Sequence, residues 1–552
     1  MEPLCRRFST ATFDENGELT DISLHYEDNY NFAFDVVDAI AAEEPDKRAL
    51  VWCNEAGQEG VLTFGDIRRL SNQAANYLTA QGIRRGDRVL LLLGRHFEYW
   101  YLMMALHKIG ALAIPGVHML KPHDIAYRLD AAEVHAVICT EDPDLCQRVL
   151  SAVSESKAEP LLFNVRAPHE GFVQLDEKLP AQSDAFERPE THADDPLLMY
   201  FTSGTTGNPK MVMHTHTYSL AHIVTAGYWQ CVQNDGLHLT VADTGWAKAS
   251  WGKLYGQWLC GSAVLAYEFS RFDGERMMDV IEKYGVTTFC APPTLYRLMA
   301  KSGLRREAFS SIQHASTAGE ALQEEIIRLF YEKTGLEIME GYGQTETVLI
   351  IGNYAGGHPK RGSMGKPNPL YKLRLVNPQG EDLPAGETGE IVIDTRERMP
   401  EGLCQRYEKN EHANARYWKD GVFHTGDTAY RDEDGYYYYV GRLDDVIKSS
   451  GYRIGPFEVE SVLIGHPSVL ECAITGVPDP ERGQLVKATV VLRPGCEGSP
   501  ALADELKAFV KERTAPYKYP RIIEFVEELP KTVSGKICYN VIRERDAKKA
   551  KA

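Results

Sequence analysis

Apolar residues recur along the chain in two alternating patterns, one typical of helices and one typical of buried strands. Near the N-terminus, apolar residues from Ile67 to Leu78 return at helical spacing, and Gly82 marks the end of that helix. A strand, a helix and a second strand are then predicted at residues 88–93, 101–109 and 135–140. This alternation predicts βαβ units, whose strands form a parallel sheet.

The same alternation returns later in the chain and then changes. A strand, a helix and a strand are predicted at residues 261–268, 274–285 and 287–293. From about Leu370, short strands and turns predict a small β-subdomain, and after residue 443 the elements become short and mixed. We therefore predict an α/β protein with two domains. The first is a large N-terminal domain of parallel-rich sheets with the β-subdomain, residues 1–443, and the second is a small, mobile C-terminal α+β domain, residues 444–552.

The composition and charge of the chain argue against several classes of binding partner. The formal charge of −18 and the pI of about 5.5 argue against a nucleic-acid or anionic-membrane surface. The longest apolar segment is interrupted by His107 and Lys108 and is too short to span a bilayer, and the N-terminal residues lack the apolar segment of a secretory signal. Eleven cysteines without a C-x-x-C pair indicate neither a disulfide framework nor a zinc site, so we expect a reducing, cytoplasmic location.

One stretch, "YFTSGTTGNPK" at residues 200–210, combines hydroxyls, glycines and a lysine, which favours an anion such as a phosphate. The spacing differs from a Walker loop, because Lys210 follows Gly207 by three residues. A flexible surface loop is the alternative. However, an apolar strand precedes the stretch and "MVMHTHTYSLAHIV" after it has a helical pattern, so we predict the strand, turn and helix arrangement that holds phosphate in α/β sheets.

Five further stretches follow the glycine-rich one in a fixed order. They are "TAGE" (317–320), "EGYGQTET" (340–347), "YWKDGVFHTGD" (417–427), "GRLDDVIKSSGYRIGP" (441–456) and "PKTVSGKI" (530–537). This set, in this order, resembles the adenylate-forming superfamily of acyl-CoA synthetases, luciferases and nonribosomal adenylation domains. The resemblance covers residues 35–543, and "GYGQTET" with "APYKYPR" is most similar to the medium-chain acyl-CoA synthetases.

The resemblance implies a ligase that uses ATP, Mg²⁺ and coenzyme A on a small carboxylic acid. ATP converts the acid to an acyl-adenylate, and the thiol of coenzyme A then takes the acyl group. Most of the protein's task in such chemistry is to position and neutralise phosphate charge. The phosphates of ATP would be wrapped by Thr202, Ser203, Gly204, Thr205, Thr206, Gly207, Asn208, Pro209 and Lys210.

Further roles are implied by the same resemblance. Tyr342 would stack on adenine, Thr345 would contact the α-phosphate, and Glu346, with Thr205, would hold Mg²⁺. Asp427 would accept the ribose hydroxyls, and Lys536 would bridge the acid and the α-phosphate as the catalytic lysine. The remaining nucleotide contacts would come from Gly319, Glu320, Ala321, Glu340, Gly341, Gly343, Gln344, Arg442 and Arg453.

The C-terminal domain is expected to turn about Asp444 between the two half-reactions, because relatives rotate there. Gly451 would then line the pantetheine path, where a side chain would obstruct it. Contacts with coenzyme A are expected from Ser450, Tyr452, Lys511 and Arg521.

The acyl pocket is expected from "DTGWAKASWGKLYGQW", by resemblance. Its candidate residues are Trp229, Trp246, Lys248, Trp251, Cys290 and Gly343. Acetate-specific relatives carry tryptophan where this chain has Gly343, so a short-to-medium-chain, branched or single-ring acid is expected. An aryl-CoA ligase, a different thiol acceptor and a luciferase-like oxygenase remain alternatives. A non-catalytic ATP-binding module is disfavoured, because Lys536, Glu346 and Asp427 are all present.

Overall fold

The chain forms two compact units in the computed structural model, which describes residues 2–202, 208–320, 322, 324–450, 452–531 and 537–549, with only the backbone of Arg453. The first unit contains residues 1–371 and 397–415, and the second contains residues 372–396 and 416–552. The expected hinge residue, Asp444, lies within the second unit, and its role stays a prediction.

The first unit holds a sheet of mostly parallel strands with antiparallel strands at one edge. Its order is β21 (Arg406–Glu408), β11 (Lys210–Thr215), β10 (Pro196–Thr202), β6 (Leu112–Pro115), β5 (Arg88–Leu92), β7 (Ala136–Cys139), β8 (Leu161–Asn164) and β9 (Val173–Gln174). β5, β6, β7, β8 and β10 follow the parallel pattern that the βαβ alternation predicts. Strands buried on both faces read as continuous apolar runs, and the four residues of β7 are all buried.

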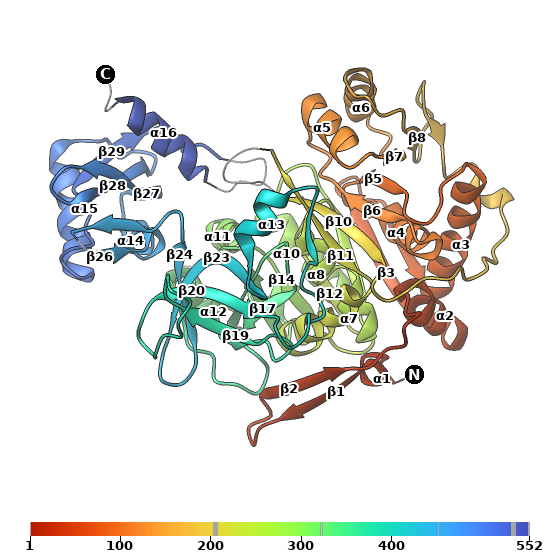
Figure 1. Ribbon diagram of the computed structural model, residues 1–552, viewed down its shortest axis with the longest axis horizontal. Helices are drawn as coiled ribbons and strands as arrows, with labels where there is room; N and C mark the ends of the chain where they lie inside the picture. Colours follow the sequence, from red (N-terminus) through yellow and green to blue (C-terminus); the bar gives the residue numbers. More distant parts are fainter. Residues whose placement is uncertain are drawn as a thin grey trace. The chain divides into compact units, whose positions relative to one another are not determined.

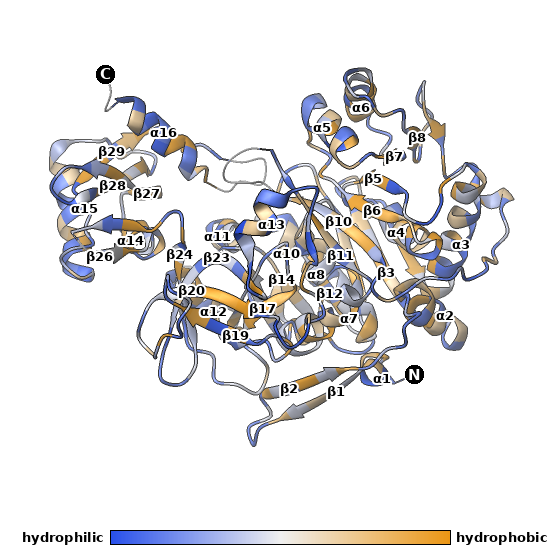
Figure 2. Ribbon diagram, in the orientation of Figure 1, coloured by the Kyte–Doolittle hydropathy of each residue, from blue (hydrophilic) through white to orange (hydrophobic). Residues whose placement is uncertain are grey.

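A second, larger sheet completes the first unit. Its order is β18 (Lys366–Pro367), β17 (Leu349–Gly352), β16 (Ile338–Gly343), β15 (His314–Ala318), β14 (Thr288–Cys290), β12 (Leu237–Thr240), β13 (Ala263–Glu268), β3 (Arg48–Asn54) and β4 (Glu59–Thr63). The strands from β16 to β3 are parallel, whereas the two ends of the sheet are antiparallel. Hydrophobic residues, orange in Figure 2, run along strands such as β10 and β17.

The predicted helices cover these sheets. α3 (Phe64–Ala80) begins at a capping box in which Thr63 Oγ1 accepts from Asp66 N and Asp66 Oδ2 accepts from Thr63 N, both at 3.1 Å. α4 (Glu98–Ile109) and α10 (Gly274–Tyr284) also match the predicted segments. α5 (Pro122–Ala131) and α6 (Pro143–Glu155) lie beside β5 and β7 and share their hydrophobic core (Figure 1). No helix in the described ranges has the length and apolar character needed to cross a membrane.

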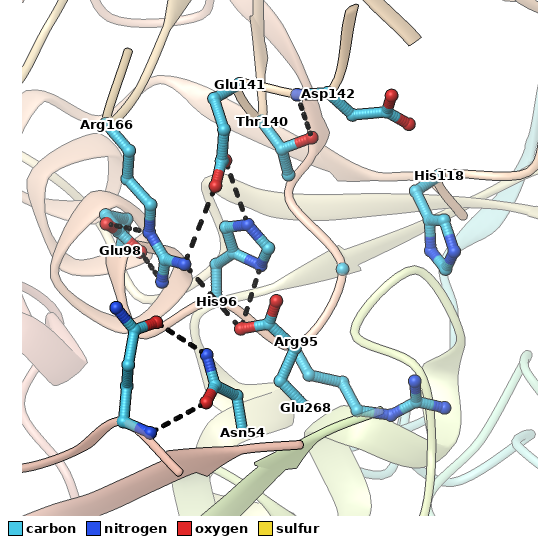
Figure 3. Close-up of polar contacts among 12 residues, drawn as sticks. Asn54, Arg95, His96, Glu98, His118, Thr140, Glu141, Asp142, Arg166 and Glu268 are labelled. Carbon is cyan, nitrogen blue, oxygen red and sulfur yellow. Dashed lines mark hydrogen bonds and ion pairs between the residues drawn. The ribbon is translucent and has the colours of Figure 1, made fainter. Parts of the chain in front are cut away.

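An ionic cluster joins the carboxyl ends of strands from the two sheets (Figure 3). His96, after β5, lies between two carboxylates, with Nε2 at 3.1 Å from Glu141 and Nδ1 at 3.4 Å from Glu268. Arg166 binds Glu98 at 2.7 and 2.9 Å and lies 3.6 Å from Glu268. A neutral imidazole carries one N–H, so it can donate to only one of its two carboxylates at a time.

The second unit contains the predicted β-subdomain and the C-terminal α+β elements. One sheet consists of β19 (Leu373–Val376), β20 (Gly389–Asp394), β22 (Trp418–Lys419), β23 (Val422–Arg431) and β24 (Tyr437–Arg442). The other consists of β25 (Ile447–Ser449), β26 (Tyr452–Ile454), β27 (Val469–Asp479), β28 (Gly483–Leu492) and β29 (Ile522–Val526). The helices of this unit include α14 (Pro456–Ile464), α15 (Pro500–Arg513) and α16 (Tyr539–Lys549).

The helix predicted over residues 211–224 is wrong for its first part and correct from Thr217 onward. Residues Lys210–Thr215 form β11, which pairs antiparallel with β10 on one side and with β21 on the other. The helix α7 (Thr217–Ile223) begins only after this strand. The apolar residues of this stretch include Met211 and Met213, which pack in the hydrophobic core on a face of the sheet, and the pairing with β21 comes from a distant part of the chain.

Candidate active site

The glycine-rich stretch connects the two strands of a β-hairpin. Thr202 and Lys210 form the last residue pair of the β10–β11 ladder. Ser203, Gly204, Thr205, Thr206 and Gly207 lie outside the described residues. Because a strand and not a helix follows the stretch, the predicted strand, turn and helix arrangement is not found here, and the phosphate-binding role of the stretch stays a prediction. The loop is anchored at its far end, because the Tyr127 hydroxyl donates to the Pro209 carbonyl at 3.0 Å.

The second motif lies at the end of β16, next to the "TAGE" strand. β15 and β16 are parallel, and Thr317 pairs with Glu340 in their register. Two motifs that are separate in sequence therefore leave the same edge of the sheet. Glu320 accepts from Thr294 Oγ1 at 3.3 Å and lies 3.9 Å from Arg297. Ala321, which was predicted beside them, lies outside the described residues.

The side chain of Glu340, the first residue of "EGYGQTET", is buried. Burial raises its pKa to about 7, although the Leu322 N–H donates to Oε1 at 3.2 Å. The Glu340 carbonyl accepts from Trp229 Nε1 at 3.2 Å and from Asn353 Nδ2 at 3.1 Å. Glu340 thus fixes the strand, and its carboxyl is only about half ionised near neutral pH.

Thr345 and Glu346 accept hydrogen bonds from residues on β11 and β21, two strands of the other sheet of the first unit. His214, on β11, donates through Nε2 to the Thr345 carbonyl at 2.8 Å, which requires the proton on that nitrogen. Burial lowers the pKa of His214 to about 4, so the imidazole is neutral. Glu346 Oε1 accepts from the Tyr407 hydroxyl at 2.8 Å, and the Glu346 carbonyl accepts from Cys404 N at 2.7 Å.

Two tryptophans predicted for the acyl pocket pack against the glycines of the motif. The Trp229 and Trp251 rings lie 6.4 Å apart at 86°. A Cβ atom on Gly341 would lie 2.6 Å from Trp229 Cε2, and one on Gly343 would lie 2.3 Å from Trp251 Cη2. The space left by the missing side chain of Gly343 is therefore occupied by the indole of Trp251.

The other predicted acyl residues lie in different surroundings. Lys248, on α8 (Ala247–Gly252), donates to the Ala318 carbonyl at 2.7 Å and so connects this helix to β15. Cys290 is buried at the end of β14. Trp246 packs against the core of the first sheet, whereas Trp229 and Trp251 pack on each other.

The second unit brings together the predicted ribose contacts. Asp427 and Arg442 are paired in the β23–β24 ladder, and Arg442 Nε lies 3.5 Å from Asp427 Oδ1. The Tyr439 hydroxyl donates to the same oxygen at 3.2 Å. Asp444 pairs with Arg416 at 2.6 Å. The catalytic lysine candidate, Lys536, and the side chain of Arg453 lie outside what the structure describes.

Residues predicted to contact coenzyme A also lie on the second unit. Ser450 follows β25 with a φ of 52°, and its N–H donates to the Arg482 carbonyl at 2.9 Å. Tyr452 stacks on Tyr517, with ring centroids 4.1 Å apart. Lys511 and Arg521 both lie over the Tyr519 ring, at 5.6 and 4.9 Å. Gly451 lies outside the described residues.

Several residues near the predicted motifs were missed from the sequence, including Tyr127, His214, Tyr407, Tyr517 and Arg482. Each contacts a predicted residue through a bond or a stack that depends on the fold. None belongs to the motif that it supports, and only Tyr517 stands in a stretch that carries the family resemblance, "APYKYPR".

Comparison with known proteins identifies the family. The AMP-binding enzyme family matches residues 37–401, and the AMP-binding enzyme C-terminal domain matches residues 458–536. The chain belongs to the AMP-binding enzyme family. It is an AMP-forming acid–thiol ligase of the adenylate-forming superfamily, an acyl-CoA synthetase that uses ATP to form an acyl-adenylate and transfers the acyl group to coenzyme A.

Relatives of this acyl-CoA synthetase cover nearly its whole length. Acyl-coenzyme A synthetase ACSM3, mitochondrial, from Mus musculus is 39% identical over 535 residues, which are 95% of this chain and 92% of the relative. The solved structure of the anthranilate CoA ligase AuaEII in complex with anthranoyl-AMP is 29% identical, with a TM-score of 0.86 and coverage of 96% of this chain and 99% of that chain. A benzoate CoA ligase from Burkholderia xenovorans LB400 is 28% identical, with a TM-score of 0.81 and coverage of 93% and 100%.

Proposed function

We propose that this acyl-CoA synthetase activates a short-to-medium-chain carboxylic acid, including branched acids. The contact between Trp251 and Gly343 supports the upper size limit of this proposal. Gly343 lies two residues before Thr345, the predicted α-phosphate contact, and the acid must meet that phosphate. The indole that fills the space beside Gly343 therefore lies close to the reacting carboxylate, where it would limit the length of the acyl chain.

A single-ring aromatic acid is the second candidate. The similar ligases of known structure include one for anthranilate and one for benzoate. Trp229 and Trp251 meet edge to face, and such aromatic walls suit a flat ring as well as a branched chain.

Mg²⁺ is proposed as the metal that accompanies ATP. Glu346 supplies a carboxylate oxygen, the ligand type that Mg²⁺ prefers, and Mg²⁺ is commonly held by one or two carboxylates with substrate phosphates. The residues present therefore fit this ion, with Thr205 as the second predicted ligand. When bound, the metal would neutralise phosphate charge during adenylation.

The other roles proposed for this chain follow the motifs. Tyr342 would stack on adenine, Asp427 and Arg442 would hold the ribose, and Lys536 would act in adenylation. The residues Ser450, Gly451, Tyr452, Lys511 and Arg521 would serve transfer to coenzyme A, with rotation about Asp444. We also propose a cytoplasmic location, supported by free thiols at all eleven cysteines, although the curated relatives are named as mitochondrial. Imaging of the tagged full-length protein tests it, and an organellar signal would contradict it.

Pyrophosphate release across a panel of acids tests the substrate proposal. The panel contains straight acids of two to ten carbons, branched acids of four and five carbons, and benzoate, each with and without coenzyme A. We expect the highest kcat/KM for a four- to six-carbon acid and acyl-CoA formation only with coenzyme A. A preference for acetate or for acids of ten carbons would refute the size assignment. A preference for benzoate would select the second candidate.

A further inference from the structure

We propose that Tyr407 is a positioning residue for the adenylation half-reaction, because it contacts two of the charged groups that would bind Mg-ATP. Its hydroxyl donates to Glu346 Oε1 at 2.8 Å. The ammonium of Lys210 lies 4.7 Å from the centroid of its ring. Glu346 is the predicted metal ligand and Lys210 ends the predicted phosphate loop, so one side chain connects the two motifs. This inference rests on the proposed roles of those two residues.

The backbone around Tyr407 is firmly held. β21 pairs antiparallel with β11, and Tyr407 stands opposite Val212 in the register. The Tyr407 N–H donates to Asn414 Oδ1 at 2.8 Å, and Asn414 Nδ2 donates to the Tyr407 carbonyl at 2.9 Å. The ring itself is only 1% exposed. A side chain fixed in this way can impose its geometry on its neighbours.

The same segment also holds the backbone of the Glu346 motif. Cys404 N donates to the Glu346 carbonyl at 2.7 Å, and Val348 N donates to the Gly402 carbonyl at 3.1 Å. The motif is therefore bound to the chain before β21 through its backbone and to β21 through the carboxylate of Glu346. Any shift of Tyr407 would be transmitted to Glu346.

The chemistry of a tyrosine suits this position. The phenol donates to the carboxylate of Glu346 without adding charge beside it. The face of the ring attracts the Lys210 ammonium without neutralising it, as a carboxylate would. With Oε1 taken by the phenol, Oε2 is the oxygen that we expect to face the metal. Tyr407 thus orients an anion and a cation and leaves the charge of each available.

Two variants separate the two contacts. Tyr407→Phe removes the hydroxyl and keeps the ring, whereas Tyr407→Leu removes both. Tyr30→Phe is the matched control, because Tyr30 is also 1% exposed and its hydroxyl lies 3.0 Å from Ser219 Oγ. Pyrophosphate formation is measured against Mg²⁺ and against ATP, and acyl transfer to coenzyme A is measured from supplied acyl-AMP.

We expect Tyr407→Phe to raise the Mg²⁺ concentration for half-maximal activity about tenfold, since a hydrogen bond to a charged group is lost. Its KM for ATP at saturating Mg²⁺ should stay within about twofold, whereas Tyr407→Leu should raise both values. Tyr30→Phe should match the parental enzyme, and transfer from acyl-AMP should be unchanged in all variants. A purely structural role would instead lower both half-reactions together.

Binding of Mn²⁺ in the presence of ATP, followed by electron paramagnetic resonance, gives a readout that needs no acid substrate. Tyr407→Phe should weaken Mn²⁺ binding about tenfold, while Tyr30→Phe should not change it. Parental Mn²⁺ affinity in Tyr407→Phe would overturn the inference. If the parental enzyme released pyrophosphate with none of the acids, the proposed function would fail, and the Mn²⁺ measurement would still decide the role of Tyr407.

Discussion

Alanine at position 343 tests whether Gly343 and the indole of Trp251 compete for one space. The added Cβ would lie 2.3 Å from Trp251 Cη2 and 2.7 Å from the Val348 carbonyl oxygen. Contacts this short require a shift of the indole or of the backbone, and overpacking of a buried site costs about 1–3 kcal/mol. We therefore expect Gly343→Ala to lower the free energy of unfolding by about 2 kcal/mol and to slow adenylation.

Trp251→Leu supplies the second arm of a double-mutant cycle. Leucine removes the atoms that meet the new methyl group, so the double variant should recover about 1 kcal/mol of the loss as a coupling energy. Recovery should be incomplete, because the contact with the Val348 carbonyl remains. Trp251→Leu alone should also shift the substrate preference toward longer acids. Room for about two methylenes, each worth about fourfold in affinity, would favour the longer acid by about fifteenfold.

Unfolding in urea and kcat/KM for acids of two to eight carbons provide the measurements. Gly60→Ala is the control, because a Cβ atom there meets no atom within 4 Å. Additive effects of Gly343→Ala and Trp251→Leu would show that the two residues do not share a space. An unchanged chain-length profile in Trp251→Leu would refute the assignment of the indole as the end of the acyl pocket.

Three further predictions concern the second unit. Lys536→Ala should abolish acyl-adenylate formation and spare transfer from supplied acyl-AMP, since its charge is needed only in the first step; equal loss of both in half-reaction assays would contradict this. Gly451→Leu should block transfer and spare adenylation, and a parental rate of acyl-CoA formation would exclude the proposed path. Burial raises the pKa of Glu460 from 4.5 to about 7, so the folded state binds the proton more tightly and stability should fall as pH rises between those values, by up to about 3 kcal/mol. Glu460→Gln should remove this slope in urea unfolding at pH 5 and pH 8, and an unchanged slope would contradict the assignment.

Local patterns predicted those parts of the fold that local forces determine. α3 begins where Thr63 and Asp66 cap each other and ends before Gly82. Both ends of the helix can therefore be recognised from residues that are close in sequence. The buried parallel strands were equally visible as apolar runs. β11 was mistaken for a helix because its character depends on two partner strands, and β21 lies far along the chain.

The candidate site, too, could be predicted only where a local sequence motif marks its residues. Motifs marked the residues that would touch ATP, but the groups that orient them carry no motif. Tyr407 stands in "CQRYEKN", which contains nothing typical of a binding site, and its importance comes from a hydrogen bond to Glu346. The packing of Trp251 on Gly343 was equally invisible, because both residues were predicted for the pocket but their contact depends on how α8 meets β16.

The charges around the predicted nucleotide motifs explain how an acidic chain can attract ATP. The formal charge is −18, yet two of the three carboxylates of these motifs in the first unit have a raised pKa or a nearby arginine. Burial raises the pKa of Glu340 to about 7, which removes much of its charge near neutral pH. Glu320 lies 3.9 Å from Arg297, whereas Glu346 accepts a hydrogen bond from the neutral Tyr407 phenol. An incoming phosphate would therefore respond to these local groups and to Lys210 more than to the net charge, since charges beyond about 8–10 Å are largely screened at physiological ionic strength.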